Sequence, residues 1–218
     1  MFEVKNISMI YDMNTDIRTC ALKGFDLNLP DKGLVGIIGP SGSGKSTLMY
    51  CLSTLKLPTE GSIVYNGTEL TGIDNTQREK LRRREFGFIF QKHYLVPYMT
   101  AMDNCLVAAL QKGPEVQAKA EECFQELGLS QKEWRKKPAK LSGGQCQRVA
   151  IARAMINDPK VIFADEPTAS LDHENAFIVM RILKKYSSER LVLVVTHDRS
   201  ILQDADQIIE MWDGEISR

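Results

Sequence analysis

The chain has 218 residues, enough for one large domain or two small ones with a substantial hydrophobic core. Its 28 lysines and arginines balance its 28 aspartates and glutamates, so the formal net charge is zero. We therefore expect no nucleic-acid partner, because domains that bind polyanions usually carry an excess of basic residues. The five cysteines form no CxxC pair, which predicts free thiols in a reducing compartment rather than a disulfide framework or a zinc site.

The apolar segments are too short for a membrane span of about 20 residues. The first residues also lack the apolar core of a signal peptide. Any role at a membrane is therefore expected to come through a partner protein.

The first two predicted strands, at residues 2–11 and 21–29, alternate apolar and polar side chains and should pair as an antiparallel hairpin. Tyr11 ends the first strand, next to a predicted loop that begins at Asp12. An exposed aromatic ring there could stack on a nucleotide base, or it could pack locally. The residues around it leave both interpretations open.

A phosphate-binding loop is the clearest motif of the chain. Its residues, which fit the pattern G-x-x-x-x-G-K-[ST], are Gly39, Pro40, Ser41, Gly42, Ser43, Gly44, Lys45, Ser46 and Thr47. An apolar strand at residues 34–38 precedes the loop, and leucines at helical spacing follow it at Leu48, Leu52 and Leu55. The glycines allow successive N–H groups to surround an anion, and the helix N-terminus adds its dipole. Lys45 can reach the outer phosphates, and the hydroxyl of Ser46 can bind Mg²⁺.

A charged segment at residues 78–85 predicts a solvated helix face rather than a nucleic-acid contact, because glutamates interrupt its basic residues. A buried strand at residues 86–90 should then end at Gln91. In a parallel α/β sheet, a residue at the carboxyl end of a strand lies at the ligand crevice. Its amide could bind Mg²⁺ or position water, although a polar residue that merely ends a strand is the alternative.

A mostly helical insert should run from about His93 to Ser142. It contains a capping box at Thr100 and Asp103, a helix predicted to continue through Leu110, and a second helix at residues 115–127. A buried helix follows as far as Ile156 and begins at Ser142, Gly143, Gly144 and Gln145. Ser142 and Gln145 fit a capping box, but two glycines weaken a helix and suit a second phosphate contact. Because one nucleotide needs one such loop, the second should serve another molecule's nucleotide.

Two further strands should end in polar residues at the same crevice. The strand at residues 161–164 ends in Asp165 and Glu166, which suit Mg²⁺ binding and polarisation of the attacking water. The strand at residues 191–195 leads to His197, which could hydrogen-bond a terminal phosphate. Residues 206–216 predict a last pair of strands around an Asp-Gly turn.

Together these motifs resemble the ATP-binding subunit of an ABC transporter, in the family's order and over the whole chain. Gly39–Thr47 matches its Walker A motif, Val161–Glu166 matches Walker B with the adjoining glutamate, and Leu141–Gln145 reads LSGGQ, the family signature. Further matches are Gln91 to the Q-loop, Ser170–Asp172 to the D-loop, His197 to the switch histidine and Tyr11 to the adenine-stacking aromatic. Phe86–Gln91 with Leu95, Pro97 and Thr100 is similar to the macrolide-exporter and lipoprotein-releasing group, whereas Cys146 stands where glutamine is usual.

The resemblance implies an α/β fold: a P-loop NTPase core of mostly parallel sheet, with an antiparallel β subdomain and an inserted α-helical subdomain. Residues 1–218 would form a single ATPase domain, with 1–92 and 156–218 in the core and 93–155 in the helical subdomain. The implied cofactors are ATP and Mg²⁺. The implied catalytic residues are Glu166, His197, Gln91 and Lys45; the metal ligands are Ser46, Gln91 and Asp165; and ATP contacts are Tyr11, Gly39–Thr47, Ser142, Gly143, Gly144, Gln145 and Asp172.

The implied partners are a second copy of the chain, which would close an ATP sandwich, and a multispanning permease on a separate chain. The resemblance places the chain on the cytoplasmic side of a cell membrane, in a bacterium. A crevice around Gln91, Phe86, Leu95 and Tyr98 is the predicted seat of a permease helix. The alternative is a soluble ABC ATPase that acts on nucleic acid or the ribosome, although no long coiled coil separates the Walker motifs.

Overall fold

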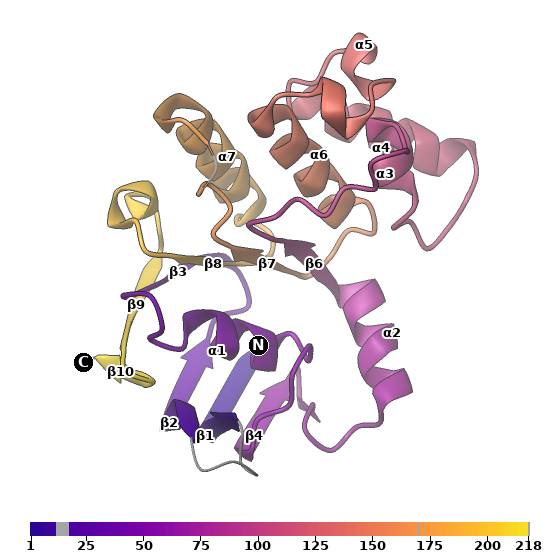
Figure 1. The fold of residues 1–218 in the computed structure, drawn as a ribbon. Helices are drawn as coiled ribbons and strands as arrows, with labels where there is room; N and C mark the ends of the chain where they lie inside the picture. Colours follow the sequence, from indigo (N-terminus) through magenta and orange to yellow (C-terminus); the bar gives the residue numbers. More distant parts are fainter. Residues whose placement is uncertain (12–17, 170, 218) are drawn as a thin grey trace.

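The structure, a computed structural model, describes residues 1–11, 18–169 and 171–217. Two β-sheets face each other, and helices cover the outer side of the larger sheet (Figure 1). The strands are β1 (Phe2–Tyr11), β2 (Thr19–Leu29), β3 (Gly33–Ile38), β4 (Glu60–Tyr65), β5 (Thr68–Glu69), β6 (Phe86–Ile89), β7 (Val161–Asp165), β8 (Leu191–Thr196), β9 (Gln207–Trp212) and β10 (Glu215–Ser217). The helices are α1 (Lys45–Leu52), α2 (Asn75–Glu85), α3 (Ala101–Leu106), α4 (Pro114–Glu126), α5 (Gln131–Trp134), α6 (Gly143–Met155) and α7 (His173–Tyr186), with 3₁₀ turns η1 (Pro138–Lys140) and η2 (Arg199–Leu202).

The larger sheet has the strand order β10-β9-β3-β8-β7-β6, and only β10 runs antiparallel to its neighbour. Every residue of β7 and β8 is buried, as expected for central strands of a parallel sheet covered on both faces. This arrangement confirms the predicted α/β class and its mostly parallel sheet. Because parallel strands end at one edge, the segments after β3, β6, β7 and β8 meet there.

The two faces of the larger sheet belong to two hydrophobic clusters. Successive residues of β3 alternate between them: Val35 and Ile37 pack with α1 and the smaller sheet, while Leu34 and Ile38 pack with α3, α4, α6 and α7. Helix α1 therefore lies between the two sheets, where it can present its N-terminus to the carboxyl edge of the larger one (Figure 1).

The smaller sheet has the order β2-β1-β4-β5, and all its pairs are antiparallel. This confirms the predicted hairpin of the first two strands. The predicted loop that begins at Asp12 lies outside the described residues, and so does Ser170.

Two helices end earlier than their sequence patterns predict. Helix α3 stops at Leu106 rather than at Leu110 because the side chain of Asn157 binds the backbone that follows it. The Asn157 side chain accepts a hydrogen bond from the Leu110 amide (2.9 Å) and donates one to the Ala108 carbonyl (2.8 Å). Helix α1 stops at Leu52, so that Leu55 lies beyond it and is 43% exposed.

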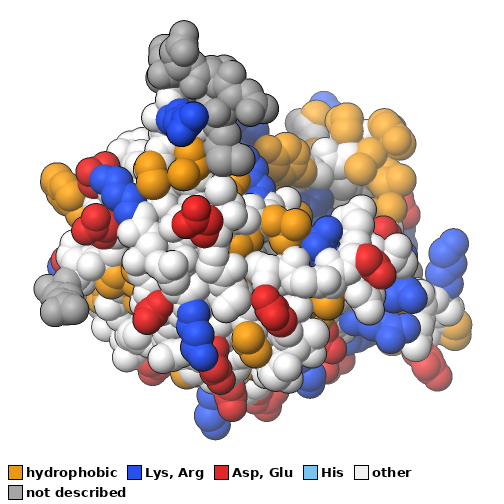
Figure 2. All heavy atoms as spheres, turned by 90° about the horizontal axis from the view of Figure 1, so that it is seen from below, with side chains coloured by type: hydrophobic (Ala, Val, Ile, Leu, Met, Phe, Trp, Pro, Cys, Tyr) orange, Lys and Arg blue, Asp and Glu red, His pale blue; other side chains and the backbone are white. Residues whose placement is uncertain are grey.

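The end of α1 is held by the charged helix α2. Arg82 donates to the carbonyl and the hydroxyl of Thr54 (2.9 and 3.1 Å), which has a left-handed backbone (φ 58°). Helix α2 buries none of its residues, which confirms the predicted solvated face. Figure 2, which views the molecule from below, shows acidic and basic side chains interspersed over this side, in line with the balanced charge.

All five cysteines are free thiols, as predicted. Within the part of the chain that the structure describes, none of the helices combines the length and the apolar character needed to cross a bilayer.

Candidate functional site

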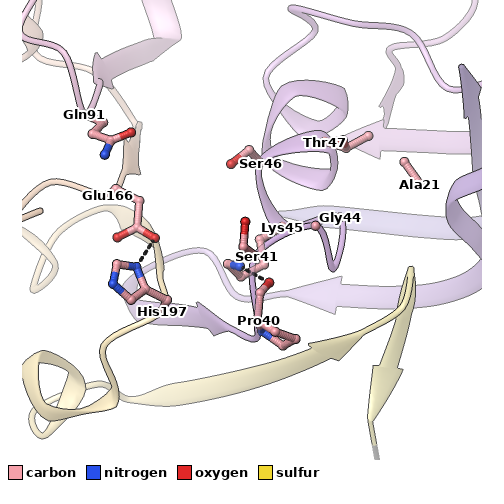
Figure 3. A pocket seen from close by; sticks show the side chains of 11 residues that line it. Ala21, Pro40, Ser41, Gly44, Lys45, Ser46, Thr47, Gln91, Glu166 and His197 are labelled. Carbon is pink, nitrogen blue, oxygen red and sulfur yellow. Dashed lines mark hydrogen bonds and ion pairs between the residues drawn. The ribbon is translucent and has the colours of Figure 1, made fainter. Parts of the chain in front are cut away.

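A cavity of about 690 Å³ opens where the strands of the larger sheet end at their carboxyl edge. Figure 3 shows its lining side chains in two groups: the loop before α1 and the start of α1 on one side, and Gln91, Glu166 and His197 on the other. The lining residues are Ala21, Pro40, Ser41, Gly42, Gly44, Lys45, Ser46, Thr47, Gln91, Glu166 and His197. The cavity thus brings together residues that the sequence scatters over more than 150 positions.

The loop from Gly39 to Gly44 fits tightly between two neighbouring segments. A Cβ on Gly39 would lie 2.1 Å from the Met211 carbonyl oxygen, and a Cβ on Gly44 would lie 2.3 Å from that of Ala21. Both glycines also have positive φ (156° and 94°), so no other residue fits either position without strain. Strands β2 and β9 therefore clamp the loop, which explains why its glycines are needed.

The N-terminus of α1 faces the cavity with its amide groups free of side-chain caps. Its N-cap residue is Gly44, which offers no side-chain acceptor. The first amides of a helix have no partner within the helix, so they can bind an anion. The loop and helix end together have the geometry of a phosphate cradle.

Lys45 supplies the positive charge of this cradle. Its ammonium group donates to the carbonyls of Gly39 and Pro40 (both 2.8 Å), so the loop backbone holds it at the mouth of the cradle. Burial lowers the pKa of the Lys45 ammonium, while the carboxylates of Glu166 and Asp165 oppose the shift. The two hydrogen bonds from Lys45 to the loop backbone place its ammonium group where it could contact the outer phosphates of a nucleotide.

Ser46 and Asp165 meet behind the cradle. The Ser46 hydroxyl donates to Oδ1 of Asp165 over 2.9 Å, and Asp165 is only 8% exposed. Among the described residues, no three His, Cys, Asp or Glu side chains gather as a metal cage. Mg²⁺ commonly takes one or two carboxylates with phosphate oxygens and water, so a hydroxyl and one carboxylate beside a phosphate cradle fit this ion.

Glu166 and His197 form a pair at the ends of β7 and β8. The His197 Nδ1 lies 2.7 Å from Oε1 of Glu166 (Figure 3). The Thr196 hydroxyl donates to Oε2 of Glu166 over 3.3 Å. Glu166 has a left-handed backbone (φ 48°), held by a bond from its amide to the Val195 carbonyl (2.8 Å). Such strain in a non-glycine residue clusters at functional sites. The strained backbone turns the Glu166 carboxylate into the cavity.

The signature residues lie away from this lining, at the start of α6. The capping box is present: the Ser142 hydroxyl accepts from the Gln145 amide (3.2 Å), and the Gln145 side chain accepts from the Ser142 amide (2.9 Å). Ser142 and Gly143 are exposed, whereas Gly144 is buried against Asn175. The structural interpretation of this motif is therefore correct, and its exposed side remains open to a partner.

Four more predicted contact residues do not line the cavity. Gly39 and Ser43 lie in the loop but do not line the cavity. Gly39 packs against the Met211 carbonyl, and the amide of Gly214 donates to the Ser43 carbonyl over 3.1 Å. The Tyr11 hydroxyl lies 3.3 Å from Oγ1 of Thr47, and the Lys56 ammonium lies 4.3 Å from the centre of the Tyr11 ring. Asp172 caps α7 by accepting from the Asn175 amide (2.9 Å). Tyr11 therefore sits at the edge of the site, and Asp172 acts here as a helix cap.

The predicted seat for a permease helix is wrong in one residue. Phe86 is 6% exposed and packs against Phe2, Tyr65 and Phe163 at the opposite end of β6 from Gln91. Tyr98, in contrast, is 71% exposed.

Two residues of the site were missed from the sequence. Ala21 lines the cavity through β2, and Tyr50 donates from its hydroxyl to Oδ2 of Asp165 over 3.0 Å. Burial, followed by the Asp165 charge, raises the pKa of Tyr50 to about 12, so the phenol stays protonated. Its position four residues after Ser46, on one face of α1, is the signal that could have identified it.

The family model described as ABC transporter matches residues 22–169, which is more than half of the chain. The chain belongs to the ABC transporter family. The ABC transporter ATP-binding protein MJ0796 of Methanocaldococcus jannaschii is 39% identical over a match that covers 100% of this chain and 96% of that protein. The lipoprotein-releasing system ATP-binding protein LolD of Aquifex aeolicus is 45% identical, with 89% of this chain and 88% of LolD covered.

Other relatives in the ABC transporter family are longer. The macrolide export ATP-binding/permease protein MacB of Neisseria meningitidis is 42% identical over 99% of this chain but only 34% of MacB. The chain therefore spans about a third of the length of that relative, which is named as a combined ATP-binding and permease protein.

Solved structures agree with the family. The dimeric MJ0796 cassette bound to ADP and Pi matches with a TM-score of 0.92 and 38% identity over 100% of this chain and 97% of that chain. Together with the relatives, this identifies the chain as an ATP-binding and ATP-hydrolysing subunit of an ABC transporter. The comparisons do not support the soluble alternative.

Proposed function

We propose that this subunit powers a separate membrane permease by closing, as a dimer, around two ATP molecules. The observation that carries the proposal is the separation of two phosphate-binding elements. The cradle at Lys45 opens into a cavity, whereas the signature at Ser142 is exposed elsewhere on the surface. A site with one open side is completed if a second copy supplies the signature.

Within one subunit, the residues of the loop and those around the cavity have distinct proposed roles. Residues Gly39–Thr47 cradle the phosphates, Lys45 binds the outer ones, and Tyr11 stacks on the adenine. Ser46, Asp165 and Gln91 would hold Mg²⁺, which supplies charge neutralisation at the phosphates. The Ser46–Asp165 contact supports the first two of these ligands.

Hydrolysis then depends on Glu166 and His197. Glu166 accepts a proton from the attacking water as general base, and His197, bonded to Glu166, orients that carboxylate and reaches the terminal phosphate. Gln91, at the end of β6, positions the same water. Cleavage of the terminal phosphate leaves ADP and inorganic phosphate, two anions, side by side in the site. Their electrostatic repulsion opens the dimer.

The partner subunit would contribute Ser142, Gly143, Gly144 and Gln145 to each site, with Asp172 at the same interface. Backbone amides at the start of a helix suit the outer phosphates. The dimeric MJ0796 cassettes support this arrangement, since those chains resemble this one over 97% of their length.

The domain boundaries, the cellular location and the substrate class are also part of this proposal. Residues 1–218 form one ATPase domain, with 1–92 and 156–218 as the nucleotide-binding core and 93–155 as the helical subdomain. The subunit acts on the cytoplasmic side of a bacterial cell membrane, bound to its permease. The transporter would export its substrate or handle a lipoprotein or peptide; LolD, named for lipoprotein release, and MacB, named for macrolide export, support the export and lipoprotein parts of this proposal.

Co-purification tests the permease. The tagged subunit, extracted from membranes of its source cell in mild detergent, should bring down an untagged multispanning protein in stoichiometric amount. A Lys45→Ala variant with the same tag should bring down the same protein in equal amount if docking does not depend on the phosphate cradle, and membranes from cells without the tagged subunit control for nonspecific capture. Recovery of both variants only from the soluble fraction, with ribosomes, would contradict the proposal.

A further inference from the structure

The carboxylate of Asp165 receives a hydrogen bond on each of its oxygens. The Ser46 hydroxyl donates to Oδ1 over 2.9 Å, and the Tyr50 hydroxyl donates to Oδ2 over 3.0 Å. The Ser46 contact belongs to the phosphate-binding motif. The Tyr50 contact belongs to none of the motifs that the sequence presents.

Helix α1 explains why both hydroxyls reach the same group. Ser46 and Tyr50 are four residues apart, so their side chains lie one turn apart on one face of the helix. That face meets the end of β7, where Asp165 is 8% exposed. The backbone at Tyr50 is also fixed, because its carbonyl accepts from the Lys56 amide (3.0 Å) and from the Ser53 hydroxyl (3.3 Å).

We propose that Tyr50 is a positioning residue for the Mg²⁺ site: its hydroxyl fixes the plane of the Asp165 carboxylate so that Oδ1 faces Ser46 and the phosphates. This inference rests on the proposed assignment of Ser46 and Asp165 as metal ligands. It adds a residue that acts on the metal through Asp165, without contact to the nucleotide.

The physical reason is the softness of the carboxylate torsion. The last side-chain torsion of an aspartate is broad, so one hydrogen bond leaves the carboxylate free to turn. A second donor on the other oxygen removes that freedom. Hydrogen-bond partners of metal ligands typically change metal affinity or activity by about 10–100-fold when they are lost.

The test compares Tyr50→Phe with Tyr65→Phe, both in a Glu166→Gln background that suppresses turnover. Tyr65 is a matched control, because its hydroxyl also donates to a carboxylate (Glu85, 3.4 Å) but lies away from the cavity. Each substitution keeps the ring and removes one hydroxyl. Thermal unfolding with and without ATP establishes that all three proteins fold.

Two affinities are then measured. The first is the affinity for ATP in EDTA, followed with a fluorescent ATP analogue in competition. The second is the affinity of the protein–ATP complex for Mn²⁺, a spectroscopic substitute for Mg²⁺, from the loss of the free Mn²⁺ resonance with protein in excess over ATP. We expect Tyr50→Phe to weaken Mn²⁺ binding about 10-fold or more while ATP affinity in EDTA is unchanged. Tyr65→Phe should match the parent in both.

The possible results separate the inference from the proposed function. Equal Mn²⁺ affinity in the parent and Tyr50→Phe would overturn the inference alone, and so would a loss of ATP affinity in EDTA that accounts for the whole effect. A parent that holds Mn²⁺ no more tightly than free ATP does would overturn the assignment of Ser46 and Asp165 as well. A parent that binds no ATP would overturn the proposed nucleotide site itself.

Discussion

The start of α1 and the start of α6 are two helix N-termini with the same chemistry and opposite surroundings. The first is capped by Gly44, whose lack of a side chain leaves the amides free to face the cavity. The second is capped by the Ser142 side chain, and its first residues lie on the surface. Strands β2 and β9 thus enclose the first loop, whereas the start of α6 stays open on the surface.

One side chain connects the two regions. Arg153 of α6 donates to the carbonyls of Tyr94 and His93 (both 2.7 Å), in the segment that follows Gln91. A movement of α6 would therefore shift the backbone at His93 and Tyr94, close to Gln91 and the cavity.

The largest effect is expected from Glu166→Gln. The substitution keeps the shape of the side chain but removes the general base, and such groups typically contribute about 10²–10⁴ in rate. ATPase turnover should fall by that factor while ATP-bound dimers persist in light scattering. Turnover close to the parent's would remove Glu166 from this role and leave the cavity without its assigned base.

A smaller effect, confined to the other region, is expected from Ser142→Ala. Loss of an N-cap costs about 1 kcal/mol of stability. Loss of a hydrogen bond to a charged group costs about 1.5–3 kcal/mol, so ATP-driven dimerisation in the Glu166→Gln background should weaken about 10-fold or more.

Thr100→Ala is the matched control for the signature, because Thr100 caps α3 with a capping box of the same kind. It should lose similar stability in urea denaturation without weakening the dimer. If both variants dimerise equally well, the signature does not contribute to the partner's site.

The smallest effect is expected at the connection, from His93→Gln. Burial, with Arg153 adding to it, lowers the pKa of the His93 ring. The folded protein therefore binds this proton less readily than the unfolded chain, so the free energy of unfolding should fall as the pH drops below about 6.5.

Urea denaturation across that range measures this effect. His93→Gln should lose part of the pH dependence, whereas His173→Gln, which alters an exposed ring, should keep it. An unchanged pH dependence in His93→Gln would show that His93 does not link protonation to folding.

Local patterns predicted much of this fold because most elements agree with their periodicity. The alternation of apolar and polar residues predicts the hairpin of β1 and β2, and continuous apolar runs predict the buried strands β7 and β8. The rule that ligands bind at the carboxyl edge of parallel strands predicts, from the sequence alone, that Gln91, Glu166 and His197 share one cavity, and the structure confirms it.

What the sequence did not predict comes from contacts between distant segments. Helix α3 ends early because Asn157, some 50 residues away, bonds its backbone. The closeness of Phe86 to Gln91 in the sequence predicts a crevice residue, yet Phe86 lies at the opposite, buried end of β6. Tyr50 was missed because its role depends on Asp165, which follows it by 115 positions.

The place of β3 in its sheet also has a consequence for the newly made chain. Among the residues that the structure describes, the strand at residues 33–38 pairs only with residues 191–196 and 207–210. At the usual synthesis rate of about 5–20 residues per second, the nascent strand must wait roughly 8–30 seconds for its first neighbour in the sheet. The smaller sheet, complete by residue 69, can form during that interval. The nucleotide site is therefore among the last features to mature, and a translation product that stops short of β9 should be unable to bind ATP.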